Sequence, residues 1–326
     1  MGAMDHQLGV AHETTYGTAV TVSRFFEYES EGIDDSYGRT QGDPLRVGSG
    51  FVRSDRSTPY YEGASGSLQM AVLTKGFGFW LRHMTGSVPT TSGPTDSTYT
   101  HTAAEGDLFG DSFTMQINRP FHPSGTAQPF TYSGCKVTKW KLSNAVDGNL
   151  LLDLDIDAMQ VATATALATA SYPASMDNLT WAGGLITVVG TQVDVTEVAI
   201  EVDNGLKTDR RFVRQNTDKK EPTASRRSGS VSFKCDFDSL THRSRAAATT
   251  RAGTLASFTG TWRGPVLLGA TTYPEFTVTL PAIRFDDWKA STGGTEALVQ
   301  ELSGAMLYDG STSPVTLTYK SADATY

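Results

Sequence analysis

The sequence predicts a mainly β protein made of two similar halves. Three observations carry this prediction: apolar and polar residues alternate with a period of two along many segments, helix signals are few, and the order of the segments repeats. The chain has 326 residues, which corresponds to about two domains of roughly 150 residues each. Charged residues make up 19%, below the usual ~25%, and the 32 glycines favour short strands joined by turns.

The alternation is clearest in segments where every second residue is apolar. Along 150–157, leucines and an isoleucine alternate with aspartates, and along 231–238, apolar residues alternate with polar and charged ones. This pattern is typical of a strand with one buried face and one wet face. We expect strands at 25–30, 67–73, 112–118, 136–142, 149–158, 197–203, 230–237, 257–263, 275–280, 297–307 and 315–320, and a hairpin formed by 185–189 and 192–195.

Two segments carry helix signals. The first is 74–84, which has Thr74 as an N-cap and Gly86 just past its end, although two internal glycines weaken it. The second is 239–249, capped by Ser239 or Asp238.

The order strand, long loop, strand, helix and further strands occurs twice, so we expect a duplication. The first domain covers 1–160, an Ala/Thr-rich linker covers 161–184, and the second domain covers 185–326. Local matches such as 112–114 over 257–259, both Ser-Phe-Thr, support this alignment.

Each half contains a long loop, at about 32–64 and 204–228. Loops of this length inside a compact domain are usually functional or disordered. Their mixed charge suits docking onto a second copy of the chain, and the alternative is a solvated, partly disordered loop. The expected contact residues are Asp34, Asp35, Arg39, Arg46, Arg53, Arg56, Arg210, Arg211, Arg214, Lys219 and Lys220.

Composition and motifs exclude several classes of function. The net charge of -8 argues against a DNA-gripping protein, and no run of eighteen apolar residues predicts a membrane span. The opening residues lack a signal-peptide pattern, so we expect a cytosol-like compartment. Cys135 and Cys235 read as buried apolar residues, without a zinc-site spacing. No phosphate loop or nucleophile elbow is present, and we expect no cofactor, no metal and no catalytic residue.

The one candidate cluster is Asp153, Asp155 and Asp157. On a strand these carboxylates point the same way, about 6–7 Å apart. Such a row suits a hard cation, paired-carboxylate hydrolysis or the solvent face of a sheet. The solvent face is the simplest interpretation, and a row of like charges indicates that this face has a reason to be acidic.

Three segments carry a resemblance to a known family. They are 8–19 (LGVAHETTYGTA, followed by RFFEY at 24–28), 132–137 (YSGCKV) and 200–206 (IEVDNGL). Together they resemble the major tail tube protein of a long-tailed, siphovirus-type bacteriophage. The resemblance implies two tandem tail-tube-like β-sandwich domains, each with one flanking helix and a long inter-ring loop.

The resemblance also implies a structural role in the virion tail, after assembly in the host cytoplasm. The chain would form stacked rings around a channel that conducts double-stranded DNA without binding it. With two tube domains per chain, we expect a trimeric ring with pseudo-sixfold symmetry, and a hexameric ring is the alternative. The implied partners are the tape measure protein, the tail terminator and the baseplate or distal tail proteins. We expect acidic residues to face the lumen and repel phosphate, namely Asp153, Asp155, Asp157, Glu197, Glu201, Asp203, Asp236 and Asp238.

Two functions from other classes remain open at this point. A decoration protein or a receptor- or carbohydrate-binding β-sandwich would use exposed aromatic residues, for which Trp181, Trp262, Trp288, Tyr60 and Tyr61 are candidates. A β-rich hydrolase would need a pocket with two carboxylates about 5–9.5 Å apart.

Overall fold

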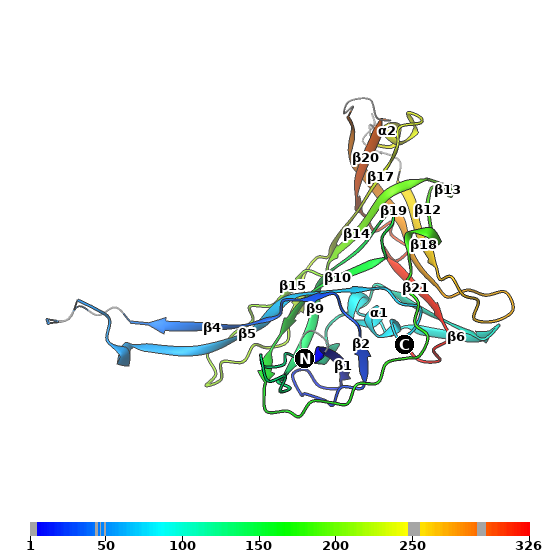
Figure 1. Ribbon diagram of the computed structural model, residues 1–326. Coiled ribbons are helices and arrows are strands. Elements are labelled where there is room, and N and C mark those ends of the chain that lie inside the picture. The colour runs from blue at the N-terminus through cyan, green and yellow to red at the C-terminus, as the bar shows by residue number, and fades with distance from the viewer. Residues whose placement is uncertain (1–4, 43–44, 46, 49, 247–254, 292–297) are drawn as a thin grey trace.

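The structure is a computed structural model that describes residues 5–42, 45, 47–48, 50–246, 255–291 and 298–326. It is mainly β, and every strand pairing among these residues is antiparallel. Figure 1 shows a base that holds both ends of the chain, an upright part, and an arm that extends sideways from the base. The elements are β1 (Gln7–Glu13), β2 (Arg24–Phe26), β3 (Ser30–Glu31), β4 (Asp34–Gln41), β5 (Ser57–Ala71), α1 (Gly78–Thr85), β6 (Thr90–Thr95), β7 (Thr98–Ala104), β8 (Ser112–Asn118), β9 (Pro129–Ala145), β10 (Leu151–Ala158), β11 (Gln160–Ala162), β12 (Gly184–Val188), β13 (Thr191–Gln192), β14 (Val195–Asp203), β15 (Leu206–Lys207), β16 (Thr223–Ala224), β17 (Ser228–Asp236), α2 (Thr241–Ala246), β18 (Ala256–Arg263), β19 (Glu275–Ser291), β20 (Val299–Met306) and β21 (Thr316–Ser321), with 3-10 turns at Ser54–Arg56 and Trp181–Gly183.

Two long strands connect the layers of the fold. Strands β9 and β19 are 17 residues each. The first part of β9 pairs with β8 and β11, and its second part pairs with β10 and β14. The first part of β19 pairs with β18 and β21, and its second part pairs with β20. Each long strand therefore belongs to two sheets.

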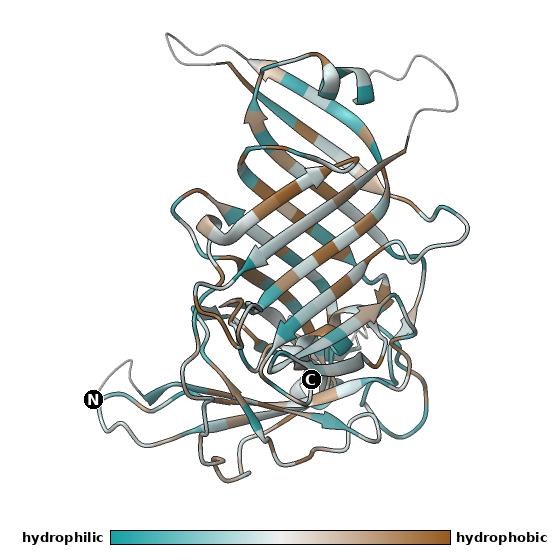
Figure 2. Cartoon of the chain, turned by 90° about the vertical axis from the view of Figure 1, so that its right-hand side faces the viewer, coloured by the Kyte–Doolittle hydropathy of each residue, from teal (hydrophilic) through white to brown (hydrophobic). Residues whose placement is uncertain are grey.

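The second parts of these strands join one sheet that runs through both halves of the chain. Its order is β3/β4, β5, β10, β9, β14, β17, β20, β19, with β3 and β4 end to end on β5. We call it the eight-stranded sheet. Figure 2 shows the alternation of apolar and polar residues along the strands of the upright part. Two smaller layers complete the fold: β2, β1, β8, β9, β11 and β13, β12, β18, β19, β21, β7, β6.

Helix α1 lies between the layers. Its Trp80 is fully buried and packs its ring against Phe113 of β8, and Trp140 of β9 donates its indole N–H to the Met84 carbonyl at 3.1 Å. Gly86 ends the helix in the left-handed region, with φ 81°, where glycine carries no Cβ penalty. The predicted start at residue 74 is wrong, because the chain adopts a positive φ at Gly76 before the helix begins.

The order of pairings in the first half recurs in the second. The series β1, β8, β9, β10, β5, β3/β4 corresponds to β12, β18, β19, β20, β17, β14. The register of β9 on β10 skips Thr138, and the register of β19 on β20 skips Asp286. Aligning these two bulges places Trp140 over Trp288.

Most predicted strands coincide with observed ones. Those predicted at 112–118, 149–158, 197–203 and 257–263 match β8, β10, β14 and β18 to within two residues, and β12 and β13 form the predicted hairpin. Strands β1, β4, β6, β7, β11, β15 and β16 were not predicted; of these, β4, β15 and β16 lie in the two segments predicted as long loops. In β1 nearly every residue is buried, so no alternation marks it. Within the predicted helix 239–249, α2 covers 241–246, and residues 247–249 lie outside the described residues, as does residue 297 of the strand predicted at 297–307.

Candidate functional site

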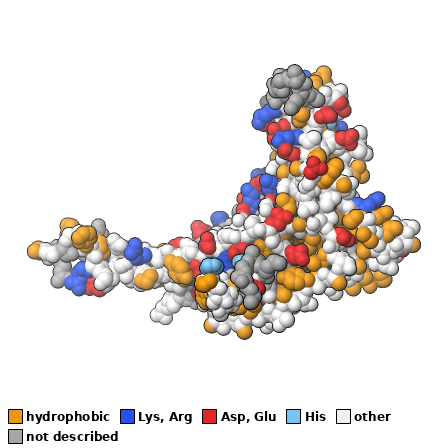
Figure 3. Space-filling view, viewed as in Figure 1, with side chains coloured by type: hydrophobic (Ala, Val, Ile, Leu, Met, Phe, Trp, Pro, Cys, Tyr) orange, Lys and Arg blue, Asp and Glu red, His pale blue; other side chains and the backbone are white. Residues whose placement is uncertain are grey.

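The wet face of the eight-stranded sheet gathers charged side chains from both halves. In β10, Leu152 and Leu154 are fully buried, whereas Asp153 and Asp155 point to the other face. Alternation forces this separation, because successive side chains of a strand point to opposite faces. Figure 3 shows charged side chains of both signs along the upright part.

Strand register arranges these charges in rows across the sheet. Asp155 lies opposite Lys139, which lies opposite Asp203 in the second half. The Lys139 ammonium contacts Glu201 at 2.5 Å, and this hydrogen bond raises the pKa of Lys139. Because cross-strand pairs of opposite charge stabilise a sheet, the rows favour the junction between β9 and β14.

The pattern continues on β17, β20 and β19. Lys234 contacts Glu197 at 2.7 Å, and Lys289 contacts Asp287 at 2.9 Å. The face is therefore not purely acidic, because lysines alternate with the carboxylates. Acidic residues still outnumber basic ones: Asp34, Asp153, Asp155, Glu197, Glu201, Asp203, Asp236, Asp287 and Glu301 stand against Lys139, Lys141, Lys234, Arg284 and Lys289.

Two of the predicted acidic residues are not part of the exposed row: Asp157 has the same orientation in β10 but is covered, and Asp238 lies beyond β17. Asp157 is only 6% exposed, and its carboxylate accepts a hydrogen bond from the Lys219 ammonium at 2.6 Å. Burial raises the pKa of Asp157, while Lys219 opposes this shift. Asp238 follows the end of β17, near His242 of α2. The other six predicted residues share the wet face.

The second long loop folds back onto the body of the protein. Glu221 contacts the buried ammonium of Lys136 at 2.7 Å, and Arg211 donates to the Glu62 carbonyl at 2.6 Å. Lys219 is buried, so it is not at the surface of the chain. The other predicted contact residues of this loop bond or stack within it: Arg210 and Lys220 lie over the Phe212 ring, and Arg214 donates to the Asp218 carbonyl.

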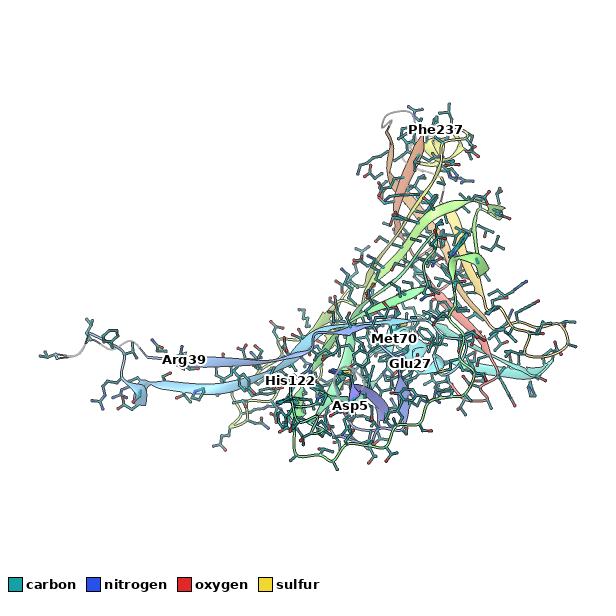
Figure 4. The ribbon with its side chains drawn as sticks, viewed as in Figure 1. Asp5, Glu27, Arg39, Met70, His122 and Phe237 are labelled. Carbon is teal, nitrogen blue, oxygen red and sulfur yellow. The ribbon has the colours of Figure 1, made fainter. Side chains whose placement is uncertain are left out.

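The first long loop forms the arm, which is a β-hairpin of β4 and the first part of β5. Arg39 lies far out along it (Figure 4). The β4 side chains are exposed or half-buried, and beyond β4 the side chains of Leu45 and Val47 are fully exposed. Of the predicted contact residues, Asp34, Asp35, Arg39, Arg53 and Arg56 lie along the arm, and Arg46 lies outside the described residues.

One buried carboxylate, which the sequence analysis did not single out, bonds the opening segment to β8 and β9. Glu13 is fully buried and accepts four hydrogen bonds. They come from the hydroxyls of Ser112 (2.7 Å) and Thr114 (2.8 Å) and from the backbone N–H groups of Gly17 (3.0 Å) and Gly134 (2.9 Å). The available signal was an acidic residue followed by Thr-Thr-Tyr-Gly. A buried charge needs hydrogen-bond donors, and Gly17 of this segment supplies one of them.

Asn204 lies in segment 200–206, another of the three segments that resemble the tail tube family, and its hydrogen bonds show what this segment does in the fold. Its side-chain amide donates to the carbonyls of Val137 (2.9 Å) and Met84 (3.3 Å), and its backbone N–H donates to the Thr138 carbonyl. It thereby satisfies a carbonyl in the last turn of α1, which helix geometry leaves without a partner. This second-half residue thus ties β14 to the first half.

A family model described as phage tail tube protein matches residues 5–265. The chain belongs to the phage tail tube protein family. It is therefore a structural protein of the virion tail and not an enzyme. None of the curated proteins matches the sequence.

The structure weakens the rival interpretations of this tail tube chain. Trp262 is buried, with its indole N–H bonded to Asn144, and Trp288 is half-buried and bonded to Gln300. Tyr60 and Tyr61 are also half-buried, and among the five aromatic residues proposed for ligand binding only Trp181 is exposed. Within the described part of the chain, no group of His, Cys, Asp and Glu is placed to hold a metal, and no helix is long and apolar enough to cross a membrane.

Proposed function

We propose that three copies of this tail tube chain form a ring with pseudo-sixfold symmetry, and that stacked rings form a hollow tube that conducts phage DNA. The main observation behind this proposal is the pairing of β14 with β9. It makes the two halves, each with four strands in the eight-stranded sheet, one continuous surface. The proposed units are tandem tube domains at 1–160 and 185–326, with the linker at 161–184.

The width of the sheet supports three chains. Three eight-stranded sheets side by side hold 24 strands. With strands about 4.8 Å apart and tilted by about 35–45°, a closed barrel of this size is roughly 45–52 Å across at the backbone. Side chains leave a bore of about 35–40 Å on the same geometry, wide enough for duplex DNA. A six-chain ring would need the second half to stand apart as decoration, whereas β14 continues the sheet of the first half.

The charges of the wet face support its placement toward the lumen. An excess of carboxylates repels phosphate, and the interleaved lysines keep the field modest. A face made of ion pairs offers few free cations for DNA to bind. DNA would therefore pass without being held.

The arm supports contact between rings. It extends beyond the body of the chain, and its outer residues have no core of their own to pack on (Figure 1). Leu45 and Val47 would be buried against a copy in the next ring, because exposed apolar groups gain free energy when removed from water. The ends of the tube would meet the tape measure protein, the tail terminator and the baseplate or distal tail proteins, with assembly in the host cytoplasm.

Electron microscopy of the purified chain, together with light scattering, tests the proposal. We expect hollow tubes or rings with six similar lobes and a mass of three chains per ring. A ring mass of six chains would overturn the trimer. A chain that stays monomeric at high concentration and binds glycans would favour the receptor-binding alternative.

A further inference from the structure

The eight-stranded sheet ends in two long edges. On one side, β19 from Arg284 to Ser291 pairs with β20, and no described strand pairs with its other side. On the other side, β3 and β4 pair with β5 alone among the described residues. Unpaired edges of this kind expose backbone donors and acceptors that can pair with another chain.

The junction between β9 and β14 shows how such edges can meet within the repeat. There, Lys141 lies opposite Glu201 and Lys139 opposite Asp203. The bulges at Thr138 and Asp286 align β9 with β19, so Lys289 takes the place of Lys141.

The same comparison aligns β14 with the edge formed by β3 and β4. Leu68 and Phe233 hold equivalent places in the sheet, since each lies opposite a leucine of the next strand, Leu154 and Leu302. Counting along the two registers on β5 and β17 then puts Asp34 in the place of Glu201.

We propose that β19 of one copy pairs antiparallel with residues 34–36 of a second copy, in the register of the β9–β14 junction. This inference rests on the proposed ring and names the surfaces that close it. Lys289 then lies opposite Asp34, and Asp287 lies opposite Ser36. The backbone groups of Trp288 and Asp35 face each other and form the hydrogen bonds.

Charge and orientation agree with this register. Asp34 and Lys289 are exposed and lie on the same wet face of the sheet, so their opposite charges would face each other across the junction, as Glu201 and Lys141 do in the register of β14 on β9. Such cross-strand pairs favour the matching register over its neighbours.

One internal contact limits the ladder of hydrogen bonds. The Ile33 carbonyl accepts hydrogen bonds from Arg119 (2.7 Å) and from the Tyr132 hydroxyl (3.1 Å). Arg119 also bonds Glu31 at 2.6 Å. Because this carbonyl is already occupied, the new ladder begins at Asp35.

Disulfide trapping tests the register in the full chain. In the proposed pair, residues 34 and 289 are not hydrogen-bonded to each other, which places their Cα atoms about 4.5 Å apart, within disulfide reach. A chain carrying D34C and K289C should form covalent multimers up to a closed trimer on oxidation. Bonding within one chain is excluded, because the seven strand spacings between the edges amount to about 34 Å.

The control carries S36C and K289C, which are offset by two residues and about 7–8 Å apart in this register. The wild-type chain, with its two buried cysteines, gives the background. Covalent multimers from D34C/K289C alone would support the proposal. Rings without cross-links, or equal cross-linking of both variants, would overturn the register but leave the tube function. Absence of both rings and cross-links would overturn the ring as well.

Discussion

Replacing Glu13 tests whether one buried carboxylate holds the opening segment of this tail tube chain. In Glu13→Ala, the hydroxyls of Ser112 and Thr114 can turn to other partners, but the backbone N–H groups of Gly17 and Gly134 cannot. Each buried donor left without a partner costs about 1–3 kcal/mol, so we expect a loss of about 2–6 kcal/mol in the free energy of unfolding. A typical domain has only about 5–15 kcal/mol in total.

Glu13→Gln gives a sharper test, because it keeps the shape of the side chain. One carboxylate oxygen accepts from Gly17 and the other from Gly134. An amide has one oxygen and one NH2 group, so either orientation turns the NH2 toward a backbone N–H. We expect a loss of about 1–3 kcal/mol, smaller than that of the alanine variant.

Urea unfolding followed by tryptophan fluorescence measures these differences in free energy. The control is the exposed Glu29, whose side chain makes no hydrogen bond to any residue that the structure describes; Glu29→Gln should change stability by less than about 0.5 kcal/mol. The reasoning fails if Glu13→Gln is as stable as Glu29→Gln.

Three further predictions concern buried polar groups. Lys219→Met leaves the Asp157 carboxylate buried without its cation and should cost about 3–5 kcal/mol, and adding Asp157→Asn should restore part of it; equal stability of the single and double variants would contradict this. Burial lowers the pKa of His83 well below 6.5, so below this pH the unfolded chain binds a proton that the folded chain does not. The free energy of unfolding should therefore fall as the pH drops below about 6.5, by up to ~1.4 kcal/mol per pH unit. His83→Gln should flatten this slope in unfolding experiments between pH 6.5 and 5.5, and an unchanged slope would refute the assignment. Asn204→Ala removes the side-chain donor to the Val137 carbonyl, while the Met84 carbonyl keeps the Trp140 indole, and should cost about 1–3 kcal/mol in thermal or urea unfolding; a neutral result would show that water replaces the amide.

Local sequence patterns were sufficient for strands that have one wet face. Alternation located β10 and β14 because their outward side chains are charged. It did not locate β1, which is covered on both faces and therefore carries no period. It also missed β7, where threonines and alanines blur the contrast between apolar and polar positions.

Contacts between distant residues decided what the sequence could not. Asp153 and Asp157 look equivalent in the alternation of β10, yet Asp157 is buried because Lys219, 62 residues further along, folds over it. The two long loops likewise read alike, but one forms the arm and the other packs on the body. The difference lies in which charges find partners, such as Arg211 with Glu62, and no local pattern records that.

The arm has consequences for the symmetry of an assembled ring. Of the two long loops, as far as the structure describes them, the one in the first half projects as a hairpin, whereas the corresponding loop of the second half lies against the body. A ring of three chains would have a nearly sixfold interior but only three arms on its outer surface. These three arms would lie 120° apart around the ring. The next ring would therefore fit onto them in three equivalent rotational orientations instead of six.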